Sequence, residues 1–227
     1  MKHTGKARRA GVKLIFWPLL AVLAAGGLAV LLGWPGWMGG LAVVLAALWL
    51  VYSGFTLYFF RDPDARTPAG AGLAVSPGHG KVDVIEQLAE SQFPGGPCHR
   101  ISIFLSVIDV HVQNAPISGS VACVTHTPGR FLSALRAECA LHNENVLIGF
   151  NSTETPGEKI GLRLIAGVLA RRIVPFVAAG DRLERGERIS LIQFGSRCDL
   201  YLPLEYKVKV RLGDKVVGGE TIVAAKS

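Results

Sequence analysis

The sequence has 227 residues, half of them hydrophobic and only 18% charged, with a net charge of +7. This composition is typical of a membrane-associated chain. Five basic residues within the first 13 positions, with no acidic residue among them, supply most of the positive charge. This tail suits anionic lipid headgroups and argues against nucleic acid as a partner, which would require a basic face on the folded domain.

Residues 14–60 contain no charged side chain. The stretch is too long for one membrane span and suits two, so we predict helices at 14–33 and 38–60. The Trp-Pro-Gly-Trp segment at 34–37 is the expected turn, with tryptophans at the membrane interface. A secretory signal peptide would have a shorter apolar region followed by a cleavage site, and the second apolar stretch argues against it. A hairpin that enters only one leaflet remains an alternative.

Basic residues flank both ends of this hairpin, in the tail and from Arg61 onward. The positive-inside rule then predicts that both termini lie on the cytoplasmic face of the cell membrane. We expect residues 1–60 to form the tail and membrane hairpin. Residues 61–227, about 165 residues in all, are enough for one compact domain with its own core.

From residue 61 onward, short β-rich runs alternate with Gly, Pro and Asp, which predicts an all-β barrel or sandwich. Residues 85–91 and 131–137 could form short helices. The expected strands lie at 101–107, 120–125, 145–150, 160–168, 189–194, 198–202, 206–211 and 221–224.

Two segments, 180–187 and 213–220, repeat a Gly-Asp turn pattern at identical spacing, and each precedes a hydrophobic run. Such turns connect strands in hammerhead barrels of the lipoyl and biotinyl type, although two unrelated turns would look the same. The four cysteines, Cys98, Cys123, Cys139 and Cys198, contain no Cys-x-x-Cys pair, so we expect buried or free thiols. No group has metal-ligand spacing.

Several short motifs occur in a fixed order along the chain: Phe-Phe-Arg-Asp-Pro at 59–63, Ser-Pro-Gly-His-Gly-Lys-Val at 76–82, Asp-Val-His at 109–111 with Pro116 beyond it, Gly-Asp at 180–181, Gly-Glu-Arg at 186–188 and Gly-Ser-Arg at 195–197. Together they resemble the phosphatidylserine decarboxylase family in its short form, which has Gly-Ser-Arg where the longer form has Leu-Gly-Ser-Thr. The resemblance covers residues 59–227.

The resemblance implies self-cleavage between Gly195 and Ser196, giving chains 1–195 and 196–227 that stay together as a heterodimer. Ser196 would become a covalent pyruvoyl group, the cofactor that forms a Schiff base with phosphatidylserine and releases phosphatidylethanolamine. A serine hydroxyl needs a base and a carbonyl held nearby to react in this way. The glycine before it permits the unusual backbone angles of an acyl shift.

The acid and base residues depart from the longer family pattern. His79 stands where the longer form has aspartate, and Asn114 stands where it has a second histidine. We expect His79 to replace the missing base for Ser196, although it could be an exposed turn residue. His111 keeps its family position, which suggests a role in decarboxylation or in protonating the product, and its unperturbed pKa suits either. Asn114 could orient the site or bond locally, and Asn143 and Glu144 could shape the pocket or form a polar turn.

Two other functions remain open at this point. A non-enzymatic, membrane-tethered adaptor of the lipoyl or biotinyl type would use the same Gly-Asp turns. It should also carry long coiled-coil heptads, and the sequence has none. A relative that cleaves itself but acts on another amine-bearing lipid is the second alternative.

Overall fold

A computed structural model describes residues 2–33, 36–91, 93, 95–132, 142–168, 172–193 and 196–226. The chain divides into two compact units. One comprises residues 5–62, and the other comprises residues 1–4 together with 63–227.

The smaller unit is a pair of helices, α1 (Lys6–Leu31) and α2 (Trp37–Phe59). Each is long and apolar enough to cross a membrane, which confirms the two predicted helices. α1 begins eight residues earlier than predicted, because Lys, Arg and Ala all favour helix and extend it into the basic tail. Trp34 and Pro35 of the expected turn lie outside the described residues.

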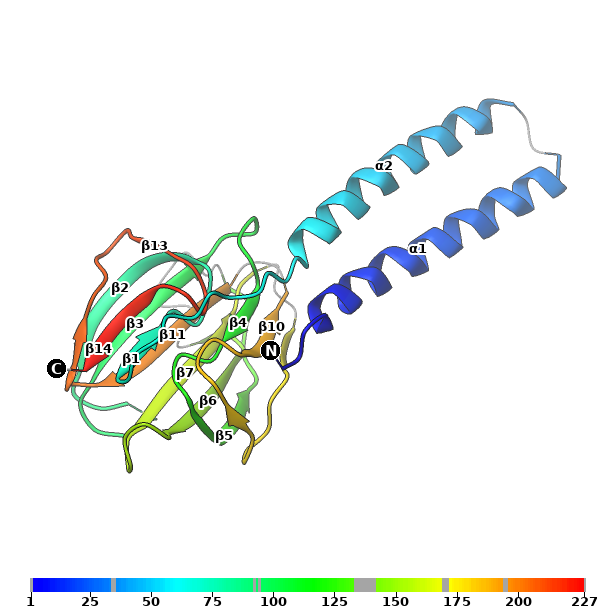
Figure 1. Ribbon diagram of the computed structural model, residues 1–227. Coiled ribbons are helices and arrows are strands. Elements are labelled where there is room, and N and C mark those ends of the chain that lie inside the picture. The colour runs from blue at the N-terminus through cyan, green and yellow to red at the C-terminus, as the bar shows by residue number, and fades with distance from the viewer. Residues whose placement is uncertain are drawn as a thin grey trace. The chain divides into compact units, whose positions relative to one another are not determined.

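The larger unit is built of antiparallel strands (Figure 1), which confirms the predicted all-β fold. Its described strands are β1 (Leu73–Val75), β2 (Gly80–Leu88), β3 (Cys98–Leu105), β4 (Val112–Asn114), β5 (Gly119–Thr127), β6 (Asn145–Ser152), β7 (Lys159–Ala166), β8 (Ile173–Pro175), β9 (Arg182–Leu183), β10 (Arg188–Ile192), β11 (Ser196–Pro203), β12 (Tyr206–Val208), β13 (Lys215–Val216) and β14 (Ile222–Lys226). One curled sheet has the order β13-β2-β3-β11-β7-β6-β5-β9. Two three-stranded sheets, β1-β14-β12 and β4-β10-β8, complete the unit.

The prediction of a short helix at 85–91 is wrong. Residues 85–88 belong to β2, whose backbone pairs with β3 from Lys81 to Leu88. Pairing with a neighbouring strand outweighs the weak local preference of such a segment. Of the segment 131–137, residues 131 and 132 have no regular structure, and 133–137 lie outside the described residues.

The strand arrangement is an internal duplication. β1, β2 and β3 correspond to β4, β5 and β6, and β7–β10 correspond to β11–β14. When each strand is exchanged for its counterpart, the order of the eight-stranded sheet is the same read from either edge. The two small sheets follow the same rule. Every corresponding pair of strands has equal length. β2 and β5 even carry a bulge at the same place, after Val82 and Val121 respectively.

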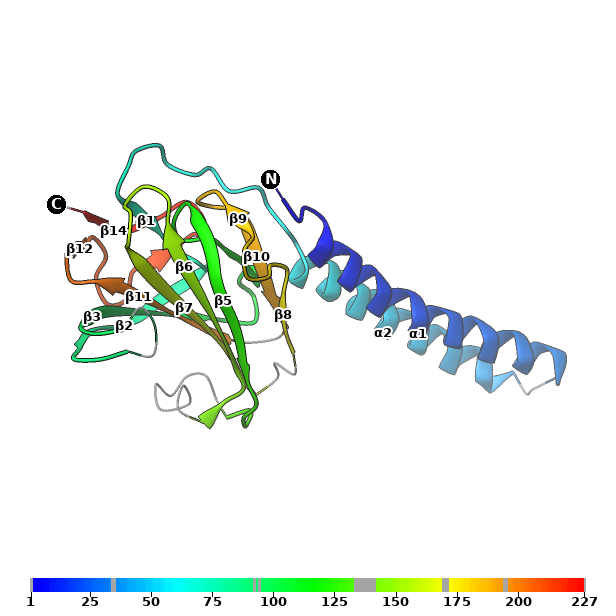
Figure 2. The ribbon, with the colours of Figure 1, turned by 90° about the horizontal axis from the view of Figure 1, so that it is seen from below.

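Reciprocal backbone bonds join the two halves where they meet. Asn114 N donates to Pro77 O at 2.8 Å, and the corresponding Val75 N donates to Pro116 O at 2.9 Å. One half, β4–β10, is continuous in sequence and is inserted between β3 and β11 of the other. In Figure 2, β5, β6 and β7 of the inserted half lie side by side.

The repeated Gly-Asp turns are part of this duplication. Gly180 and Gly213 have φ values of 93° and 92°, a region open to glycine. In each turn the aspartate carboxylate accepts a backbone N–H three residues earlier at 2.8 Å. The turns lead into the corresponding strands β9 and β13, so the two segments are structurally equivalent.

The duplication predicts two equivalent positions where only glycine fits. A Cβ at Gly80 would lie 2.1 Å from Phe104 O, and one at Gly119 would lie 2.4 Å from Asn151 O. We expect Gly80→Ala and Gly119→Ala each to destabilise the protein by roughly 1–3 kcal/mol, the usual cost of overpacking. Thermal unfolding in detergent measures this. Gly54→Ala in α2, where a Cβ meets nothing within 4 Å, is the control. Unchanged melting temperatures for both barrel variants would contradict the assigned register.

Candidate active site

Ser196 is the first residue of β11, the strand that pairs with β3 on one side and β7 on the other. Its neighbours across these strands are Leu105 and Ala166. The side chain is fully buried, and its hydroxyl has no hydrogen-bond partner among the described residues. A buried hydroxyl without a partner is costly, which makes Ser196 a candidate functional residue. Gly195 and Phe194 lie outside the described residues.

Alternation along β11 places Ser196 on the same face as Cys198 and Leu200, which belong to the hydrophobic core. Burial raises the pKa of the Cys198 thiol. This thiol therefore stays neutral, and Ser196 is the better candidate nucleophile at this end of the strand.

His111 lies at the point where the chain passes from the outer half to the inserted half. A turn closed by Ser106 and Asp109 follows β3, with Ser106 N donating to the Asp109 carboxylate at 2.8 Å. The His111 ring is fully buried, and its Nδ1 is 2.9 Å from Asp109 O. A carbonyl oxygen only accepts hydrogen bonds, so Nδ1 carries the proton and Nε2 is the basic nitrogen of the neutral ring.

His111 is also tied to the strand that leads to Ser196. Its carbonyl accepts a hydrogen bond from Ile192 N at 3.1 Å, at the end of β10. The connection formed by residues 106–111 therefore runs from the end of β3 beside Ser196 to the end of β10.

The loop that carries His79 packs over the same end. A Cβ at Gly78 would lie 3.4 Å from Cys198 Sγ and 3.4 Å from Leu105 Cδ1. Cys198 lies two residues after Ser196, and Leu105 is opposite Ser196 on β3. The loop is fixed internally by the Ser76 hydroxyl, which donates to Gly78 O at 2.6 Å.

His79 and Asn114, the two departures from the longer family pattern, are neighbours. A Cβ at Gly218 would lie 3.0 Å from His79 Nε2 and 2.9 Å from Asn114 Oδ1. The Asn114 side chain also donates to Gly186 O at 2.7 Å. The sequence separation of these residues gives no sign of this proximity, which arises from the bond between Asn114 N and Pro77 O.

Asn143 supports the strand beside Ser196. Its carboxamide donates to Ala166 O at 2.7 Å and to Leu132 O at 2.8 Å, and it accepts a bond from Leu132 N at 2.9 Å. The Glu144 carboxylate lies 3.3 Å from His126 Nε2, while the Glu144 carbonyl accepts Ala166 N at 3.0 Å. Asn143 and Glu144 therefore hold the end of β7 in place next to Ser196.

A charged cluster on the opposite face of β11 was not found from the sequence. The buried Arg197 guanidinium forms a two-point ion pair with Asp83 on β2. Asp199 is also buried, between Ser102 and Arg163 on the neighbouring strands, and desolvation raises the pKa of its carboxyl. The alternation of charges in Ser-Arg-Cys-Asp at 196–199 is the signal that could have indicated it.

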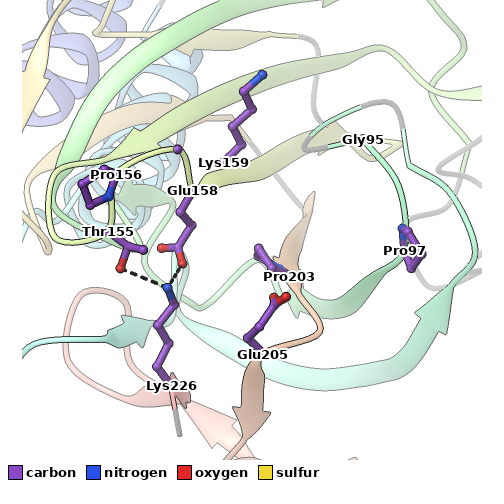
Figure 3. Close-up of a pocket in the computed structure, with 10 residues that line it drawn as sticks. Gly95, Pro97, Thr155, Pro156, Glu158, Lys159, Pro203, Glu205 and Lys226 are labelled. Carbon is purple, nitrogen blue, oxygen red and sulfur yellow. Dashed lines mark hydrogen bonds and ion pairs between the residues drawn. The ribbon is translucent and has the colours of Figure 1, made fainter.

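A polar pocket of about 450 Å³ lies at the other end of β11 (Figure 3). It is lined by the β6–β7 hairpin and by Pro203, Glu205 and Lys226. Lys226 donates to Thr155 Oγ1 at 3.0 Å and pairs with Glu158, which also accepts a bond from Tyr206. Because these charges neutralise one another, this pocket is a weaker candidate than the Ser196 end. Among the described residues, no group of three His, Cys, Asp or Glu side chains could hold a metal ion.

Comparison with known proteins identifies the family of the chain. The sequence profile named phosphatidylserine decarboxylase matches residues 52–224. A protein named phosphatidylserine decarboxylase proenzyme from Desulfotalea psychrophila is 44% identical over 79% of this chain and 83% of its own length. Proteins of the same name from Symbiobacterium thermophilum and Syntrophus aciditrophicus are 42% and 38% identical, over 91% and 97% of this chain and 92% and 98% of their own lengths.

These matches span both the helical hairpin and the barrel, and they give no support to a lipoyl-type adaptor. The identity covers nearly the full length of the relatives. The chain belongs to the phosphatidylserine decarboxylase family.

Proposed function

We propose that this protein cleaves itself between Gly195 and Ser196 and then decarboxylates phosphatidylserine to phosphatidylethanolamine with a pyruvoyl group derived from Ser196. The observation that carries the proposal is the buried, unpartnered Ser196 hydroxyl at the first position of the central strand β11. The choice of phosphatidylserine as substrate rests on membership of the family. The relatives are named proenzymes, which agrees with activation by cleavage.

Cleavage requires only groups of the chain itself and one water molecule. The Ser196 hydroxyl attacks the Gly195 carbonyl and replaces the peptide bond with an ester. Loss of the Ser196 α-proton then expels residues 1–195 as a carboxylate and leaves a dehydroalanine. Water converts this end to a pyruvoyl group and releases ammonia, so atoms balance. The buried site fits the group, because the Ser196 side chain already points into the core side of the sheet.

A pyruvoyl group at residue 196 provides an electron sink for the amine of the substrate. The chain must supply the proton transfers. His111, with its proton fixed on Nδ1, presents Nε2 as the group that can hold a proton and return it to the product. His79 is the proposed base for cleavage, because its loop packs over Leu105 and Cys198 at the Ser196 end.

The two fragments should remain associated after cleavage. Residues 196–227 contribute β11 to the centre of the large sheet, where it bonds to both β3 and β7. The same fragment contributes β12 and β14 to a second sheet. Separating the fragments would break four strand ladders, those of β11 with β3 and β7, of β14 with β1 and of β13 with β2, and would expose the core. The proposed active form is a heterodimer of the two fragments.

The apolar helices indicate membrane association. We propose that both spans cross the bilayer and that the catalytic domain lies on the cytoplasmic face, because basic residues flank both ends of the hairpin. In this proposal the smaller unit, residues 5–62, is the anchor, and the larger unit is the catalytic domain.

The first prediction concerns the nucleophile. Ser196→Ala should leave a single 227-residue polypeptide with no decarboxylase activity, because no cofactor forms. Ser102→Ala is the control, since Ser102 is also a buried serine, but it lies on β3 opposite Asp199, on the face of the sheet away from the Ser196 side chain. A denaturing gel and conversion of radiolabelled phosphatidylserine measure both effects. An active, cleaved Ser196→Ala protein would refute the proposal.

The second prediction separates the two histidines. His79→Ala should slow cleavage, whereas His111→Ala should still cleave but decarboxylate poorly. Removal of a positioned acid or base typically costs about a hundredfold to ten-thousandfold in rate. A time course of cleavage after cell-free synthesis, followed by a turnover assay, measures the two steps independently.

The proximity of His79 and Asn114 allows a sharper version of this test. His79→Asp alone should fail to process, and His79→Asp combined with Asn114→His should recover part of the cleavage by restoring the longer family pattern. If His79→Ala processes at the normal rate, the base lies elsewhere and His111 becomes the next candidate.

The third prediction concerns topology. In intact cells an impermeant thiol reagent should label Gly36→Cys between the helices, and should label Ser227→Cys only after the cells are permeabilised. Labelling of position 227 from outside would reverse the proposed orientation. Protection of position 36 in intact and permeabilised cells alike would indicate a hairpin that enters only one leaflet.

A further inference from the structure

Five large apolar side chains are exposed on the loops that surround the Ser196 end of the barrel. Their exposed fractions range from 37% for Phe131 to 60% for Ile108. We refer to them as the apolar rim: Val107, Ile108, Phe131, Leu132 and Val168.

The strand register places each rim segment near Ser196. Val107 and Ile108 lie in the turn that follows Leu105, the residue opposite Ser196 on β3. Val168 lies two residues after Ala166, the residue opposite Ser196 on β7. Phe131 and Leu132 come from a third segment, which Asn143 ties to Ala166 through its carboxamide.

Positive charge accompanies the rim. Arg130 and Arg172 are both exposed. Arg130 directly precedes Phe131, and the Arg172 carbonyl accepts a bond from Gln193, three residues before Ser196. Apolar side chains with arginines beside them are typical of a surface that rests in the headgroup region of an anionic bilayer.

We propose that the apolar rim inserts into the lipid leaflet and that the phosphatidylserine headgroup enters the site from there, directly from the bilayer. This inference rests on the proposed function. A lipid with two hydrocarbon chains loses a large hydrophobic free energy if it leaves the membrane, roughly 0.8 kcal/mol for each CH₂ group brought into water. If the apolar rim covers the hydrocarbon chains of the lipid while its headgroup reaches residue 196, this free-energy cost is avoided.

Two features of the chain indicate that the apolar rim contacts a bilayer and not a second protein. The same polypeptide carries two apolar helices that tether the barrel unit to a membrane. The rim also borders the site of an enzyme family whose substrate is a membrane lipid. Exposed apolar clusters on a soluble surface generally mark such an interaction.

The test measures turnover by the full-length protein in nanodiscs with phosphatidylserine in two physical states. One substrate is a long-chain lipid within the bilayer, and the other is a short-chain lipid dissolved as monomers. Ile108→Ser combined with Val168→Ser removes the two most exposed rim side chains. We expect kcat/KM for long-chain phosphatidylserine in the nanodisc to fall about tenfold or more, the range expected for 1.4 kcal/mol or above. Turnover of a short-chain, monomeric phosphatidylserine should change less than about twofold, because it reaches the site through water.

Leu204→Ser is the matched control, because Leu204 is 44% exposed but follows Pro203 at the opposite end of β11. It should affect neither substrate. A gel confirms that each variant cleaves fully. Equal losses on both substrates, or no loss on the bilayer substrate, would overturn the rim proposal. Absence of turnover by the unaltered protein on both substrates would instead overturn the proposed function.

A second measurement does not depend on activity. An environment-sensitive fluorophore at Ile108→Cys should be quenched by lipids that carry a nitroxide on the acyl chain, and the same probe at Leu204→Cys should not. Similar quenching at both positions, or none at position 108, would contradict insertion of the rim.

Discussion

The central position of β11 is the constraint on which the rest of the structure depends. Hydrogen-bond ladders to β3 and β7 fix this strand on both sides from its first residue, Ser196. A reactive group needs such support, because a loosely held nucleophile rarely reaches the geometry of attack. In the proposed self-cleavage, the same ladders would hold the 32-residue C-terminal fragment, residues 196–227, in the sheet. This strand would then serve both the cut and the assembly that follows it.

The duplication explains why the site lies where it does. In the inserted half, a short hairpin joins β6 to β7, and the chain turns back at once. In the outer half, the equivalent strands β3 and β11 are separated by the whole inserted half. Ser196 and His111 therefore flank the interruption, where a cut in the chain would leave the β6–β7 hairpin intact. At the equivalent hairpin end, Lys226 forms an ion pair with Glu158.

Sequence patterns predicted the features that depend on local composition. The uncharged stretch predicted both helices, the β-rich runs predicted most of the longer strands, and the Gly-Asp repeat predicted equivalent turns. Three-residue strands such as β4 have too few residues to leave a periodic signal. The proximity of His79 and Asn114 and the ion pair of Arg197 with Asp83 depend on strand register between distant segments, which composition does not encode. The roles of these side chains stay predictions.

The most direct test of the account is the intact mass of the purified, catalytically active protein. The account predicts two polypeptides: one that ends at Gly195, and one that comprises residues 196–227. The shorter one should be lighter than a serine-initiated fragment by the mass of ammonia, since pyruvoyl replaces its N-terminal serine. An active preparation that contains only one uncut chain, or a shorter fragment that begins with an unmodified serine, would contradict it.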